Sequence, residues 1–315
     1  MEVGAGEWVV KTLHYGYVLL FLRSPPLASR PLEFTTYVEG SVRHTALDLE
    51  VQDMLDKGAI EPVVDKLEGF YARLFLVPKV TGGWRPVFDL SALNKFLRVS
   101  PFRMETVASV LESMKVGDWM VSLDLRDAYF QIPIHTRSRK FLRFVWRDRV
   151  FQFRVLCFGL STAPQVFTKI MAPVSSWAHQ HGIFLLRYLD DWLITGSSQQ
   201  ECMSAIQAIS HLCDQLGIQV NLSKSDLVPS QRKQYLGMVL DSMRALIFPS
   251  PERISRFQSV ARSFLEDKAP LVSLWRSLLG HLASLERLVP GGRLHSQSLQ
   301  WCLKRHWRAA SDPPW

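Results

Sequence analysis

Apolar runs at 184–186 and 192–194 flank two adjacent aspartates, Asp190 and Asp191. Short apolar runs on either side of a polar break are typical of a β-hairpin. Neighbouring carboxylates at a tight turn repel each other, and a divalent cation would relieve that repulsion. Hard oxygen ligands suit Mg²⁺ or Mn²⁺. The alternative is a plain polar turn, since Asp is common in turns.

Residues 119–125 predict another strand, and its single acidic residue is the second candidate for chemistry. A period of two places Asp124 on the face of Met120 and Ser122. An aspartate in an apolar strand is unfavourable unless it is paired or bound to a metal. Tyr129 follows closely enough to pack beside whatever Asp124 binds, although ordinary core packing is an equal alternative.

Two strand-like segments, 73–79 and 84–89, are joined by a pair of glycines and predict a hairpin. Lys79 and Arg85 lie on opposite arms, so the hairpin brings both cations together. A lysine charge beside an arginine fork suits a triphosphate. The alternative is a solvated hairpin with two surface cations.

Basic and aromatic side chains alternate over 136–154, which predicts two antiparallel strands turning at 148–149. One face would bury the rings, and the other would offer cations to a nucleic-acid backbone or to solvent. Residues 233–241 predict one further strand.

Apolar spacings of three and four residues predict helices elsewhere. A strand or short helix is expected in the first 45 residues, before an irregular arm. The helical segments are 46–57, 104–114, 163–181, 199–216 and two in the tail beyond 250, where the apolar stripe is Leu271, Leu274, Leu278, Leu282 and Leu285.

The composition is that of a globular protein, with 47% hydrophobic residues among 315 and a mean hydropathy of +0.03. A net charge of +8 suggests a polyanionic partner. The four cysteines show no zinc-binding spacing, so we expect free thiols and an intracellular location, in cytoplasm or nucleus. The apolar run at 18–22 is too short to cross a membrane, so no membrane partner is expected.

In this order the segments resemble reverse transcriptases of retroelements, over roughly residues 46 to 245. The resemblance rests on 75–95, 121–131, 153–167, the Tyr-Leu-Asp-Asp box at 188–191, 216–224 and 235–237. The residues at 69–79, 188–194 and 236–242 most resemble the corresponding motifs of DIRS-type retrotransposons.

The resemblance implies an α+β, right-hand polymerase fold of fingers, palm and thumb, with an antiparallel palm sheet backed by helices. It implies an N-terminal extension at 1–45, fingers with the first palm elements at 46–118, a palm at 119–245 within a core of about 60–242, and a helical thumb or start of a connection at 246–315. The tail is shorter than the RNase H domain that follows the polymerase in this family, so that activity is expected only in a longer parent polyprotein.

The resemblance also implies an RNA-directed DNA polymerase that uses two Mg²⁺ ions, with Mn²⁺ as a substitute, on an RNA or DNA template-primer and deoxynucleoside triphosphates. The implied metal ligands are Asp124, the backbone of Leu125, Asp190 and Asp191, and Lys224 matches a residue proposed to protonate pyrophosphate. The implied nucleotide-binding residues are Lys79, Arg85, Tyr129 as the gate against a 2′-hydroxyl, Phe158 and Gly159, and the implied primer grip is Tyr235, Leu236 and Gly237.

Two alternatives stay open at this point. One is a degenerate retroelement-derived protein that binds nucleic acid without catalysis. The other is a palm-type nucleotidyl transferase such as a cyclase, which would not need the Tyr129 gate or the Tyr235 grip.

Overall fold

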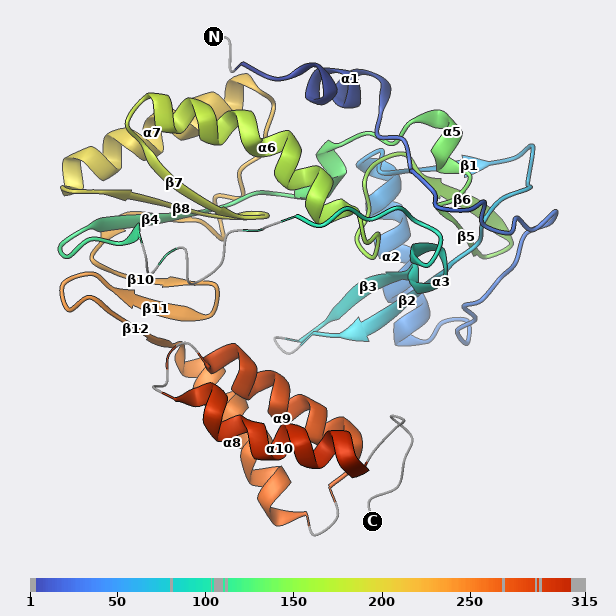
Figure 1. Cartoon of the computed structure of the whole chain (residues 1–315). Coiled ribbons are helices and arrows are strands. Elements are labelled where there is room, and N and C mark those ends of the chain that lie inside the picture. The colour runs from blue at the N-terminus through green and yellow to red at the C-terminus, as the bar shows by residue number, and fades with distance from the viewer. Residues whose placement is uncertain are drawn as a thin grey trace. The chain divides into compact units, whose positions relative to one another are not determined.

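The computed structural model describes residues 4–79, 82–102, 104, 110, 113–267, 270–286, 288 and 291–306. It combines helices with sheets whose named strands pair antiparallel, which confirms the expected α+β class (Figure 1). The chain divides into two compact units that interleave along the sequence. The first comprises Met1–Met104, Leu125–Gly182 and His211–Asn221, and the second comprises Glu105–Asp124, Ile183–Ser210 and Leu222–Trp315.

The first unit contains a three-stranded sheet in the order β1-β6-β5 and a separate β2–β3 hairpin. Its core is rich in rings, such as the stacked pair Phe144 and Phe151, whose centroids are 5.5 Å apart. Its elements are α1 (Glu7–Tyr15), α2 (Val42–Asp56), β1 (Ile60–Val63), β2 (Arg73–Pro78), β3 (Trp84–Asp89), α3 (Ser91–Asn94), η1 (Ala128–Gln131), α5 (Thr136–Arg139), β5 (Arg143–Trp146), β6 (Arg149–Phe153) and α6 (Ala163–Gln180).

The second unit contains a four-stranded sheet in the order β7-β8-β4-β9 and a three-stranded sheet in the order β10-β11-β12. Helix α7 (Gln199–Gln215) divides between the units. The other elements are β4 (Trp119–Asp124), β7 (Phe184–Tyr188), β8 (Asp191–Gly196), β9 (Asp226–Ser230), β10 (Arg232–Tyr235), β11 (Met238–Asp241), β12 (Leu246–Pro249), α8 (Pro251–Glu266), α9 (Val272–Leu285) and α10 (Gly292–His306).

Most predicted elements are present, with shifted ends. Helix α2 begins at Val42, four residues before the predicted start, because the Ser41 side chain caps it by accepting from the His44 amide. The N-terminal segment contains the helix α1. The predicted helix at 104–114 lies largely outside the described residues.

The segment 233–241 is not a single strand, as the pattern predicted. It folds back on itself, so that β10 and β11 form a hairpin with Tyr235 opposite Met238. Leu236 and Gly237 make the turn, with φ angles of 49° and 70°. Two consecutive positive φ angles are typical of the turn type that matches the twist of paired strands.

The apolar stripe in the tail is also shifted. Leu271 is 58% exposed because it occupies the N-cap position, and α9 begins one residue later. The buried residues of α9 are Val272, Trp275 and Leu278, of which only Leu278 belongs to the predicted stripe. Val272 and Trp275 pack against residues of α8 and α10, so the three C-terminal helices share a small core.

The two strands predicted within 136–154 are β5 and β6, but 136–139 form the helix α5 instead of strand. The turn between the strands falls at Arg147 and Asp148, one residue earlier than predicted. Four of its arginines are held by groups within the first unit. Arg139 and Arg154 pair with Glu61 at 3.1 Å and 3.4 Å, and Arg147 pairs with Asp48 at 2.8 Å. These cations therefore stabilise the unit itself.

Arg143 is the most buried of the four, at 5% exposure. Its guanidinium donates to the carbonyls of Lys66 and Glu68, at 2.8 Å and 3.0 Å, and to the Gln152 side chain at 3.1 Å. It thereby fixes the chain that precedes Gly69, where a side chain would meet the Arg143 Cδ at 2.7 Å.

In the described part of the chain, no helix combines the length and apolar character needed to cross a bilayer.

We predict that Arg143→Leu lowers the free energy of unfolding by about 1–3 kcal/mol, because it removes a buried hydrogen-bonded cation and leaves its acceptors without a donor. Urea unfolding followed by circular dichroism measures the change. Arg137→Leu is the matched control, because Arg137 is exposed and its side chain has no partner among the described residues. Equal losses in the two variants would contradict the structural role of Arg143.

Candidate functional site

The three predicted aspartates lie together in the second unit. Strands β7 and β8 form a hairpin in which Tyr188 lies opposite Asp191, so the turn consists of Leu189 and Asp190. Asp191 is therefore already the first residue of β8. On the other side of β8, strand β4 places Asp124 directly opposite Asp191. Cβ atoms of directly opposed residues in antiparallel strands are about 4.5–5.5 Å apart.

The turn that presents Asp190 has an unusual backbone. Leu189 has a φ of 55°, a left-handed conformation that a leucine adopts at an energetic cost. The indole N–H of Trp192 donates to the Leu189 carbonyl at 2.9 Å, and Trp192 itself is fully buried. A packed side chain thus fixes the turn conformation that the leucine does not favour.

Two further contacts hold the backbone of the aspartates. The Tyr235 hydroxyl donates to the Asp191 carbonyl at 2.9 Å. The Asp124 amide donates to the Ser225 hydroxyl at 3.0 Å, and Ser225 follows the exposed Lys224 directly. The backbone positions of Asp124 and Asp191 are therefore held from β10 and from the segment before β9.

The surroundings of Asp190 and Asp191 disfavour the ionised form of their carboxyl groups. The pKa of Asp191 is raised to about 6, mainly by burial, with the charges of Asp190 and Asp124 adding to the rise and Lys224 opposing it. Burial also raises the pKa of Asp190, with Asp124 adding to the rise and a backbone hydrogen bond and Lys224 opposing it. Lys224 therefore compensates only part of the negative charge.

A divalent cation fits this charge distribution, because bringing it to three neighbouring carboxylates replaces repulsion by attraction. The side-chain positions are not those of a formed site: in the described ranges, no three His, Cys, Asp or Glu side chains are arranged to hold a metal ion. The strand register sets Asp124 and Asp191 directly opposite each other, with Asp190 in the adjoining turn.

The candidate nucleotide-binding residues Tyr129, Phe158 and Gly159 lie in the first unit. The Tyr129 ring in η1 is 7% exposed and packs against Phe158 and Phe167, with centroids 4.9 Å and 5.6 Å away. Phe158 is 48% exposed. Gly159 has a φ of 92°, and a Cβ there would lie 2.2 Å from the Phe88 carbonyl oxygen, so only glycine permits this approach.

The β2–β3 hairpin is confirmed, and it carries both predicted cations. Arg85 pairs with Val77, and the Lys79 amide donates to the Gly83 carbonyl at 3.0 Å, so the two residues lie near the same end. Both side chains are exposed. Lys79 also lies near enough to Glu50 to lower its pKa, which burial raises.

The structure thus groups the predicted residues into two sets. Asp124, Asp190, Asp191, Lys224 and the 235–237 turn belong to the second unit. The nucleotide-binding candidates and Leu125, which forms a bridge with Val220, belong to the first. Sequence reasoning missed Ser225, because its bond to Asp124 joins segments that are far apart in the chain and carry no shared motif.

A family model described as "Reverse transcriptase (RNA-dependent DNA polymerase)" matches residues 77–240. The "Enzymatic polyprotein" of Cestrum yellow leaf curling virus is 28% identical over 158 residues, which are 50% of this chain and 24% of that protein. The "Retrovirus-related Pol polyprotein from transposon 412" of Drosophila melanogaster is 25% identical over 184 residues, which are 56% of this chain and 14% of that protein. The chain thus spans about a quarter or less of these curated relatives.

Solved structures show the same fold. A foamy viral protease-reverse transcriptase in complex with double-stranded DNA has a TM-score of 0.71 and 19% identity, covering 93% of this chain and 50% of that one. The foamy viral enzyme in complex with an RNA/DNA hybrid has a TM-score of 0.70 and 18% identity, covering 93% and 38%. At this identity the likeness concerns the fold, and it confirms the polymerase architecture that the motifs implied.

We predict that Asp191→Asn stabilises the metal-free protein at pH 8, by about 1 kcal/mol once solvent screening is allowed for. The folded-state pKa of about 6 exceeds the unfolded value of about 3.9. The folded state then binds more protons between those values, so stability falls as pH rises from 4 through 6. Urea unfolding in EDTA at pH 4 and pH 8 measures the difference, which should vanish at pH 4. A pH-independent effect would contradict the electrostatic cause.

Proposed function

The chain belongs to the reverse transcriptase family, and we propose that it acts as an RNA-directed DNA polymerase of a retrotransposon. The observation that carries this proposal is the register that sets Asp124 opposite Asp191, with Asp190 in the adjoining turn. Carboxylates that two neighbouring strands and their turn bring together suit the binding of two metal ions for phosphoryl transfer.

Asp124, Asp190, Asp191 and the Leu125 carbonyl would hold two Mg²⁺ ions, or Mn²⁺ in their place. When bound, such ions lower the pKa of an attacking hydroxyl and stabilise the charge on a leaving pyrophosphate. The chain's own contribution is to fix the backbone that carries the carboxylates: Tyr235 and Ser225 hold the backbone of Asp191 and Asp124. Lys224 would supply a proton to the pyrophosphate oxygen as it departs.

We assign the incoming deoxynucleoside triphosphate to the residues of the first unit. Lys79 and Arg85 would pair with its phosphates, since an exposed ammonium and guanidinium at one end of a hairpin suit that charge. The half-exposed ring of Phe158 and the backbone at Gly159 would lie beneath the nucleotide. Tyr129, held by its ring contacts, would exclude a 2′-hydroxyl.

We propose an RNA or DNA template-primer as the macromolecular substrate, with the 235–237 turn as the grip on the primer. The foamy viral structures were solved with double-stranded DNA and with an RNA/DNA hybrid, which supports this choice. We further propose that 46–118 form the fingers with the first palm elements, 119–245 the palm, and 246–315 a helical thumb or the start of a connection. Residues 1–45 are an extension.

From the residues of the motifs, we place the chain nearest to DIRS-type retrotransposons. The curated relatives are polyproteins of which the chain covers 24% and 14%, which supports placing it within a longer polyprotein. Three of the four free cysteines are buried, which fits an intracellular, reducing location.

Asp190→Asn should lower primer extension on an RNA template by at least about a hundredfold, because it removes one metal-binding oxygen. A primer-extension assay with Mg²⁺ and deoxynucleoside triphosphates measures the loss. Asp214→Asn, on the exposed surface of α7, is the control and should retain activity. Equal activity of wild type and Asp190→Asn would refute the proposed mechanism. Template binding without any extension by the wild type would identify a protein that only binds nucleic acid.

Tyr129→Ala should reduce discrimination against ribonucleoside triphosphates by about tenfold or more, because it removes the ring proposed to meet the 2′-hydroxyl. Single-nucleotide incorporation with paired deoxy- and ribonucleotides measures the ratio of kcat/KM values. Tyr129→Phe keeps the ring and its contacts, so it should preserve discrimination. Loss of discrimination in both variants would point to the hydroxyl, and loss in neither would exclude Tyr129 as the gate.

A further inference from the structure

The hairpin of β10 and β11 connects the carboxylate strand to the C-terminal helices. At one end, the Tyr235 hydroxyl donates to the carbonyl of Asp191. Immediately beyond Tyr235 the chain turns at Leu236 and Gly237, whose positive φ angles make the hairpin tight. This turn therefore lies directly beside the residue that holds the backbone of Asp191.

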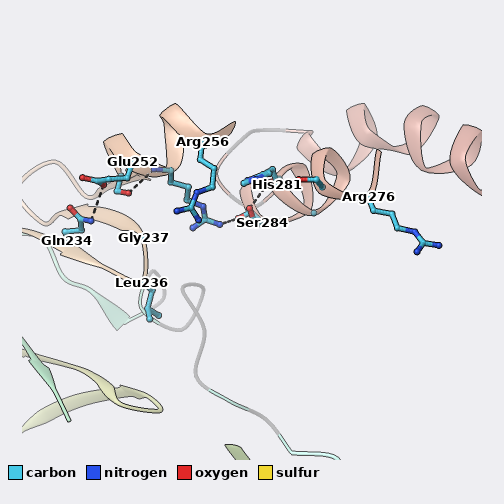
Figure 2. A pocket seen from close by; sticks show the side chains of 12 residues that line it. Gln234, Leu236, Gly237, Glu252, Arg256, Arg276, His281 and Ser284 are labelled. Carbon is cyan, nitrogen blue, oxygen red and sulfur yellow. Dashed lines mark hydrogen bonds between the residues drawn. The ribbon is translucent and has the colours of Figure 1, made fainter. Parts of the chain in front are cut away.

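The first turn of α8 packs directly on that hairpin. The Ser250 amide donates to the Gly237 carbonyl at 3.0 Å, and Ser250 is 2% exposed. The Ser250 hydroxyl in turn caps the helix by accepting from the Arg253 amide at 3.3 Å. The Gln234 side chain also donates to Glu252 at 3.4 Å, and the two reach toward each other in Figure 2.

The Arg253 side chain joins α8 to both β11 and α9. Its guanidinium donates to the Met238 sulfur in β11 at 3.4 Å and to the Ser284 carbonyl in α9 at 3.2 Å. Ser284 lies in the last turn of α9, where carbonyls lack helical partners and a cation is favourable. The Arg253 side chain also covers Gly237, since a Cβ there would lie 3.7 Å from its guanidinium nitrogen.

Two arginines near Arg253 differ from it in their contacts. Arg256 and Arg276 line the same open pocket of about 630 Å³. Neither side chain has a hydrogen-bond or ion-pair partner among the residues that the structure describes, and both are exposed. In Figure 2 Arg276 extends away from Ser284. The pocket therefore contains one arginine bonded within the protein beside two that face solvent.

We propose that Arg253 is a positioning residue, which fixes α8 and α9 to the β10–β11 hairpin and thereby sets the strand that carries Asp191 relative to the three C-terminal helices. Its consequence for synthesis rests on the proposed polymerase function: without Arg253 the chain releases its template-primer earlier, while the chemistry of each addition is unchanged. Arg253 acts through its protein contacts rather than through a phosphate of the nucleic acid.

The experiment compares Arg253→Met with Arg256→Met in the full chain. Both remove one positive charge from α8, but only the first removes contacts to β11 and α9. Arg253→Met should shorten the mean extension product in the presence of a heparin trap by about two- to thirtyfold, with single-nucleotide kcat within about twofold of wild type. Arg256→Met should change product length less.

The salt dependence of template-primer binding separates the two ways in which an arginine can act. Loss of a phosphate contact reduces the slope of log Kd against log salt by about 1, whereas loss of a positioning contact leaves the slope unchanged. Arg253→Met should therefore keep the wild-type slope. A reduced slope for Arg253→Met would overturn the proposal, because Arg253 would then be a phosphate ligand.

Hydrogen exchange provides a readout that needs no activity. Arg253→Met should raise exchange at the amides of 235–239 and in the last turn of α9, and Arg256→Met should not. Arg253→Lys keeps the charge but cannot make both contacts with one planar fork, so it should behave like the methionine variant. It replaces that variant if the methionine variant does not fold.

Two outcomes separate the positioning role from the proposed function. Raised exchange with no polymerisation by the wild type would refute the proposed function and retain the positioning role. Unchanged exchange in both Arg253 variants would overturn the positioning role.

Discussion

The pairing of Asp124 with Asp191 is the constraint on which the site depends. Side chains alternate between the faces of a strand, so a slip of one residue between β4 and β8 would send one carboxylate to the opposite face. Buried residues of both strands prevent the slip: Leu123 lies opposite Trp192, and Val121 lies opposite Ile194. The same apolar packing that stabilises the sheet thus fixes the separation of the acids.

The site also stores unfavourable free energy. Burial and mutual repulsion raise the pKa values of Asp190 and Asp191, and Leu189 adopts a left-handed backbone conformation beside them. Such features persist only where the surrounding structure imposes them. Here the buried Trp192 and the hydroxyl of Tyr235 impose them by holding the carbonyls of Leu189 and Asp191.

The sequence was informative where local signals coincide with burial. Apolar runs around Asp190 and Asp191 predicted the hairpin, and the glycine pair predicted the β2–β3 turn. The sequence pattern was misleading at 233–241, where it predicted one strand. Apolar residues continue through the turn, which the positive φ angles of Leu236 and Gly237 reveal in the structure. Strand β9 was not predicted, since its pairing with β4 joins residues more than a hundred positions apart and leaves no periodic trace.

The net charge of +8 overstates the number of cations that are free to contact a nucleic acid. Arg139 and Arg154 share the carboxylate of Glu61, Arg147 pairs with Asp48, and Arg143 is bound by carbonyls, so these four cations of the segment 136–154 already have partners within their unit. Arg253 is similarly engaged within its unit. A cation that already has protein partners must break those contacts to bind a phosphate, and this opposes the electrostatic gain. The cations available to a polyanion are therefore those without such partners. Arg256 and Arg276, which line the pocket beside Arg253, are two such cations among the described residues.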